Sequence, residues 1–77
     1  MSLKQRFASA IYHARLERGL TQARAAEELD ISLRWYQRIE YGHYLPSAKL
    51  ALKIIAYYEI DGKLLKAEPA YVSLQDS

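Results

Sequence analysis

The spacing of apolar residues along the chain predicts helices. Near the start, apolar side chains recur three and four positions apart, at Leu3, Phe7, Ala10, Ile11 and Ala14. This spacing places them on one face of a helix that runs to about Arg18. Ser2 is a good N-cap residue for that helix, and Gly19 supplies the positive φ at which helices commonly end.

A pair of short helices is expected next. Thr21 is a good N-cap for a helix over about residues 22–29, in which Ala26 is small enough to allow another helix to approach closely. Ser32 caps a helix over residues 33–40, so only about three residues connect the two helices. This is the connection length of a helix-turn-helix.

The second helix of this pair has two different faces. Tyr36 and Ile39 share an apolar face that can pack on the core. The other face is mostly polar and can meet DNA; it holds Arg34, Gln37, Arg38 and Tyr41.

Two further helices and a tail complete the pattern. Ser47 caps a helix with apolar positions at Leu50, Ala51, Ile54, Ile55 and Tyr58. Asp61 is the expected cap of a short fifth helix that carries Leu64 and Leu65. We therefore expect an all-α fold, with a compact five-helix domain over residues 1–66. Residues 67–77 form a short C-terminal tail that we expect to pack on the domain or on a second copy.

Composition narrows the function classes. The chain has 77 residues, of which 51% are apolar and 26% charged, as expected for one small folded domain. It has no cysteine, and its two histidines, His13 and His43, are too few for a metal site. Because no motif of known catalytic chemistry surrounds His13, we expect neither an enzyme nor a cofactor. No apolar run approaches the roughly 18 residues of a membrane span, so we expect a cytoplasmic protein.

Charge is distributed unevenly along the chain. The net charge of +2 and the pI near 9.0 are weak evidence for a nucleic-acid partner. Between Leu33 and Lys53, however, Glu40 is the only acidic residue. The basic residues of that stretch are Arg34, Arg38, Lys49 and Lys53, whereas Glu27, Glu28 and Asp30 form an acidic patch before it. One face of the protein is therefore expected to attract phosphate.

In order and spacing, these features resemble the phage lambda repressor and Cro (XRE-type) helix-turn-helix family, from about Ile11 to Lys66. The resemblance comes from a series of short motifs: Arg15 followed by Gly19-Leu20-Thr21-Gln22, then Ala26, Leu29, Ile31-Ser32, Ile39-Glu40, Gly42 and Leu45-Pro46-Ser47. Each motif is weak by itself, and their common order makes the resemblance specific.

The resemblance implies roles for ten residues. Base-reading positions correspond to Leu33, Arg34, Gln37 and Arg38, and phosphate-contacting positions to Gln22, Tyr41, His43 and Lys49. The glutamine at the position of Gln22 can also brace a side chain of the third helix. Arginine can bind guanine and glutamine can bind adenine through two hydrogen bonds, whereas Leu33 can only contact a thymine methyl. Arg15 and Glu40 occupy the positions of a structural pair that ties the first helix to the end of the third. His43 could also be a loop residue without a DNA contact.

Some residues depart from the family pattern. Asp30 stands where glycine is usual in the turn, and aspartate tolerates left-handed conformations better than most residues. Glu59 likewise replaces a usual glycine before Ile60. Trp35 replaces a small polar residue, and either flanks the DNA backbone or covers the joint between helices. Tyr44 either contacts phosphate or packs on the core as part of it or as a lid over it. Leu16 is apolar on a face that the family keeps polar.

The function that the resemblance implies is sequence-specific DNA binding. We expect a transcriptional regulator, a repressor, that binds double-stranded DNA as a homodimer, without a small-molecule effector or a membrane partner. The dimer surface is expected at residues 71–74 or at exposed apolar residues such as Leu16 and Tyr57. The alternative is an antitoxin that binds a protein toxin, through the fold and the tail, while repressing its own operon.

Overall fold

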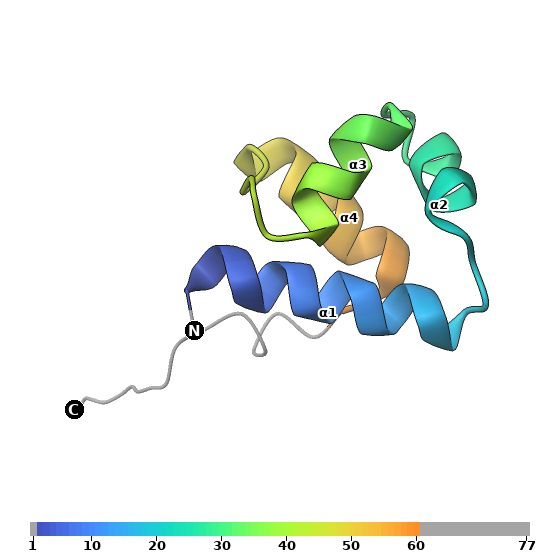
Figure 1. Ribbon diagram of the computed structural model, residues 1–77, viewed down its shortest axis with the longest axis horizontal. Helices are drawn as coiled ribbons and strands as arrows, with labels where there is room; N and C mark the ends of the chain where they lie inside the picture. Colours follow the sequence, from blue (N-terminus) through green and yellow to red (C-terminus); the bar gives the residue numbers. More distant parts are fainter. Residues whose placement is uncertain (1, 61–77) are drawn as a thin grey trace.

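Four helices make up the part of the chain that the computed structural model describes, residues 2–60 (Figure 1). They are α1 (Leu3–Glu17), α2 (Gln22–Glu28), α3 (Leu33–Glu40) and α4 (Ala48–Tyr58). These residues contain no strand, which confirms the all-α class. The sequence predicted five helices; the fifth, beginning at Asp61, and the tail over residues 67–77 lie outside the described residues. No helix within residues 2–60 has the length and apolar character that a membrane crossing requires.

The helices pack on α1 and α3. In Figure 1, α1 runs along one side of the molecule, α3 and α4 lie across it, and α2 lies near the C-terminal end of α1. α1 contacts both α3 and α4, and α2 contacts α3. The sequential pair α2 and α3, joined by a tight turn, is the predicted helix-turn-helix.

Every helix begins at a hydroxyl N-cap, as the sequence predicts. The capping oxygen accepts a hydrogen bond from the backbone N–H three residues later in each case, at Ser2, Thr21, Ser32 and Ser47. At Ser2 the Gln5 side chain accepts in return from the Ser2 backbone N–H, which completes a capping box. Such caps matter most for α2, because a seven-residue helix is marginal without them.

Every helix also ends in the same way, with one left-handed residue. These residues are Gly19, Asp30, Gly42 and Glu59, with φ of 67°, 60°, 79° and 55°. After each of them, the next backbone N–H donates to the carbonyl five residues back, as Ile31 does to Ala26 at 3.0 Å. Three of the residues that follow are apolar and pack on the core: Leu20, Ile31 and Ile60. Both residues that stand where glycine is usual, Asp30 and Glu59, are thus left-handed, as expected for Asp30.

The core is small and closely packed. Its fully buried side chains come from all four helices: Phe7, Ile11, Ala25, Ala26, Leu29, Tyr36, Ile39, Ile54 and Tyr58. Ala25 and Ala26 belong to α2, which packs against α3, and their methyl groups permit this close packing. Leu3, predicted on the buried face of α1, is instead 50% exposed, because it stands at the first residue of the helix, beyond the elements that cover the rest of that face.

We expect Glu59→Gly to raise the free energy of unfolding by about 1 kcal/mol. A left-handed conformation costs a non-glycine residue roughly 1–2 kcal/mol, and the greater freedom of glycine in the unfolded chain offsets part of this gain. The contact between Glu59 and Arg18, at 3.6 Å, is exposed and contributes little. Urea denaturation measures the change. Glu17→Gly, in a right-handed residue of α1, is the matched control and should lower stability; a similar loss in both variants would contradict strain at Glu59.

Candidate nucleic-acid interface

The two faces of α3 have different surroundings. Its inner face, formed by Tyr36, Ile39 and Glu40, is buried. On its outer face the predicted base-reading residues Leu33, Arg34 and Arg38 are exposed, and Gln37 is half-buried. The eight residues of α3 form a helix about 12 Å long. An α-helix with its side chains is about 10–12 Å across, and the major groove of DNA, about 12 Å wide, can admit it.

The end of α3 is tied to α1 by a buried ion pair between Arg15 and Glu40. The Arg15 guanidinium donates through Nε and Nη2 to the two carboxylate oxygens of Glu40, both at 2.9 Å. The two side chains are only 11% and 1% exposed. A third donor of Arg15, Nη1, bonds to the carbonyl of Leu20 at 2.8 Å. The pair therefore fixes α1, the segment before α2 and the end of α3 relative to one another.

Gln22, predicted to contact phosphate, is bonded inside the protein. Its Nε2 donates to Glu40 Oε1 at 2.9 Å, and its Oε1 accepts from Gln37 Nε2 at 3.1 Å. The Tyr41 hydroxyl lies 3.3 Å from Gln22 Nε2. The structure thus brings three predicted DNA-contacting residues together around Glu40. A phosphate contact by the Gln22 side chain would require it to exchange its hydrogen bond with Tyr41.

Two buried tyrosines, Tyr36 and Tyr58, join α3 to α4 beside this network, a polar contact that was not predicted from the sequence. The Tyr58 hydroxyl lies 2.6 Å from that of Tyr36. Either hydroxyl can donate in this pair. The Tyr36 hydroxyl also helps to lower the pKa of the Glu40 carboxyl. The signal in the sequence was two tyrosines on helix faces predicted to be buried, since a buried tyrosine hydroxyl needs a partner.

Glu40 stays ionised in this environment. Burial alone would raise the pKa of its carboxyl, but the hydrogen bonds from Arg15, Gln22 and Tyr36, together with the charge of Arg15, outweigh burial and hold the pKa below its usual value. Burial also raises the pKa of Tyr36 well above its usual value, so its hydroxyl remains a donor.

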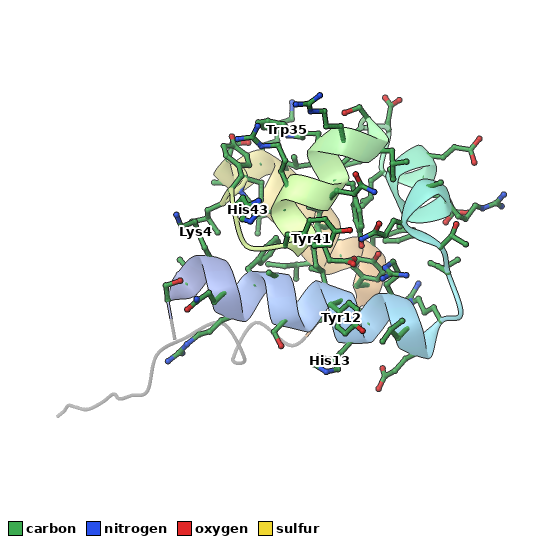
Figure 2. The ribbon with its side chains drawn as sticks, viewed as in Figure 1. Lys4, Tyr12, His13, Trp35, Tyr41 and His43 are labelled. Atoms are coloured by element: carbon green, nitrogen blue, oxygen red, sulfur yellow. The ribbon has the colours of Figure 1, made fainter. Side chains whose placement is uncertain are left out.

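The other predicted phosphate contacts lie on the surface after α3. Tyr41, His43 and Lys49 are exposed. The rings of Tyr41 and His43 are 6.3 Å apart in an edge-to-face arrangement, and Figure 2 shows both beside the end of α3. Lys49 lies in the first turn of α4. The Tyr41 hydroxyl is bonded to Gln22. The side chains of His43 and Lys49 make no hydrogen bond or ion pair with any of residues 2–60 and are available to a ligand.

Tyr57 differs from the prediction that it is an exposed apolar residue suited to a dimer surface. It is half-buried, and its hydroxyl donates to Glu28 of α2. The Arg18 guanidinium also lies over its ring, 5.6 Å from the centroid. The Tyr57 phenol therefore connects α4 to α2. Leu16, the other exposed apolar residue expected at a dimer surface, is 49% exposed.

Glu40→Gln is expected to lower the free energy of unfolding by about 3 kcal/mol, because it leaves Arg15 as a buried charge without its counter-ion. Chemical denaturation monitored by circular dichroism measures the loss. Glu27→Gln is the matched control: Glu27 contacts Arg24 at 4.0 Å on the surface, and its loss should change stability by less than about 0.5 kcal/mol. Equal effects would show that the burial of Glu40 has no energetic consequence.

The lowered pKa of Glu40 predicts loss of stability in acid. The unfolded chain binds the Glu40 proton more readily than the folded chain, so stability rises with pH over this range. The contribution of Glu40 is complete above the unfolded pKa of about 4.3 and is lost as the pH falls through the lower folded pKa. Unfolding measured from about pH 6 down to pH 3 should therefore show a steeper decline for the native protein than for Glu40→Gln. Parallel curves would argue against this assignment.

Comparison with known proteins agrees with this geometry. Residues 11–65 match the family model described as helix-turn-helix, which spans the second half of α1 and all of α2, α3 and α4. The chain has no significant match among curated proteins or solved structures. Since the family match covers more than half of the chain, the protein belongs to the lambda repressor/Cro-like (XRE-type) helix-turn-helix family of DNA-binding transcriptional regulators.

Proposed function

We propose that the protein is a sequence-specific transcriptional repressor of the cytoplasm, which binds an operator as a homodimer with α3 in the major groove. The main support is the charge of the surface around α3. Glu40, the only acidic residue between Leu33 and Lys53, is buried and neutralised by Arg15. All exposed charge of this stretch is therefore positive, from Arg34, Arg38, Lys49 and Lys53. Such a surface attracts the phosphate backbone.

The base-reading assignment follows from the outer face of α3. Arg34 and Arg38 are exposed and make no ion pair with any of residues 2–60, so their donors are available to guanine O6 and N7. Leu33 offers an apolar surface to a thymine methyl. Gln37 is held by Gln22 and presents its remaining amide donor and its oxygen to a base.

Phosphate contacts would flank this helix. Tyr41 and His43 follow the C-terminal end of α3, and Lys49 lies at the start of α4. Gln22 lies at the first residue of α2. Contacts of this kind set the register of a protein on DNA without selecting a sequence.

The length of α3 favours a dimer. A helix of about 12 Å covers roughly four base pairs, which distinguishes only about 250 sequences. A genome offers about 10⁶–10⁹ competing sites, so one copy of α3 contacts too few base pairs to select a single operator. Two copies on half-sites about 34–36 Å apart would read an inverted repeat on one face of the DNA.

The antitoxin alternative depended on the tail, which lies outside the described residues.

The proposal is tested by selection of bound sites from a random DNA pool. We expect enrichment of one inverted repeat, whose symmetry reports dimerisation. On that site, Arg34→Ala should abolish the preference at one base pair of each half-site, at about 1–3 kcal/mol, whereas Lys49→Ala should weaken all sequences alike and reduce the salt dependence. Binding is measured by gel retardation between 50 and 200 mM salt. Selection of no sequence would overturn the proposal, and uniform loss from Arg34→Ala would remove its base-reading role.

A further inference from the structure

Trp35 is held in place from two sides. Its ring is partly buried against the core, and its centroid lies 4.3 Å from that of Tyr44, with the planes tilted by 49°. Tyr44 belongs to the segment between α3 and α4, so the contact pins that segment to the helix. The backbone N–H of Trp35 also donates to the Ser32 capping oxygen at 3.0 Å. Figure 2 shows Trp35 on the side of α3 that faces away from α1.

Arg38 lies over this ring. Its guanidinium carbon is 5.6 Å from the Trp35 centroid, within the range of a cation–π contact. The two residues are three positions apart on α3 and therefore share a face. Arg34 differs, since it is also exposed on α3 but has no aromatic ring beneath it within residues 2–60. Of the two arginines proposed to read bases, Arg38 thus contacts an aromatic ring of the protein and Arg34 does not.

A ring and a base edge use different parts of a guanidinium. Stacking on an aromatic ring engages the flat face of the group, whereas its five N–H donors lie in the plane, at the edge. A bidentate contact with guanine needs two of those in-plane donors. Arg38 can therefore stack on Trp35 and bind guanine at the same time. A salt bridge to a carboxylate would instead have used the donors that the base requires.

We propose that Trp35 is a positioning residue that sets base discrimination through Arg38. The ring holds the guanidinium in one orientation before DNA binds, so less of the rotational freedom of the arginine is lost in the complex. Discrimination at the base read by Arg38 depends on Trp35, and discrimination at the base read by Arg34 does not. The proposal rests on the proposed function, in which both arginines read bases.

The contact itself is tested in the free protein. Trp35 is the only tryptophan of the chain, so the tryptophan fluorescence reports on its surroundings alone. Arg38→Ala should uncover one side of the ring and shift the emission to longer wavelength, whereas the matched control Arg34→Ala should leave the spectrum unchanged. An unchanged spectrum in Arg38→Ala would overturn the proposal. This measurement needs no DNA, so its result is independent of the proposed function.

The effect on discrimination is tested on the selected operator. Trp35→Leu should reduce the preference for guanine at the Arg38 position by about threefold to tenfold, with less than about a twofold change at the Arg34 position. Adding Trp35→Leu to Arg38→Ala should cause no further loss at that base. A merely structural role would lower discrimination at both positions, or add to the loss in the double variant, and either result would overturn the proposal.

A second variant covers the case in which Trp35→Leu does not fold, as judged by circular dichroism. Trp35→Phe keeps an aromatic ring of weaker cation–π strength and the contact with the core. Its preference at the Arg38 position should lie below that of the native protein, with the Arg34 position unchanged. Equal discrimination by tryptophan and phenylalanine at both positions would overturn the proposal. A native protein that selects no DNA would overturn the proposed function instead.

Discussion

A carboxylate that is buried and ionised must collect hydrogen bonds from its surroundings, because an uncompensated charge in a protein interior costs several kcal/mol. In this protein the requirement falls on Glu40, the last residue of α3. Its partners come from α1 through Arg15, from α2 through Gln22 and from α3 through Tyr36. Tyr58 adds α4 through the Tyr36 hydroxyl. The position of α3 is therefore fixed at one group, which Arg15 connects to α1 and Gln22 connects to α2, while the bonded pair of Tyr36 and Tyr58 connects α3 to α4.

The sequence predicted the scaffold well because the scaffold depends on local signals. The four hydroxyl caps and the left-handed residues Gly19, Asp30 and Glu59 act within one turn of the chain, where residue type and conformation are closely linked. The apolar periodicity likewise identified the buried residues of α3 and α4. Leu3 was wrongly placed in the core because periodicity gives the face of a helix and not how far along that face the neighbouring elements reach.

The site was harder to predict because its contacts join residues far apart in the sequence. Gln22 was expected to contact phosphate and to brace a side chain of the third helix, and its amide is bonded to Gln37 of that helix. Its bond to Glu40 was not foreseen, because it depends on the crossing of α2 and α3. Tyr57 was expected on the surface, but it is half-buried, because its hydroxyl is bonded to Glu28 of α2. Trp35 had two open roles in the sequence, and only the path of the segment after α3 brings Tyr44 against it. The apolar periodicity of the sequence predicts which face of a helix a residue lies on, but its contacts with other helices depend on how the helices pack.

The division of α3 into a buried and an exposed face has a consequence for how such a regulator can evolve. The residues that hold the helix, Tyr36, Ile39 and Glu40, are separate from Leu33 and Arg34, whose side chains extend into solvent. In the proposed mode of binding, a new operator preference arises by exchange at positions 33 and 34 without remodelling the scaffold. Gln37 is bonded to Gln22, and Arg38 lies on Trp35, so exchanges there require a matching change elsewhere. Divergence among descendants of this protein should accordingly begin at the N-terminal end of α3 and proceed in coupled pairs towards its C-terminal end.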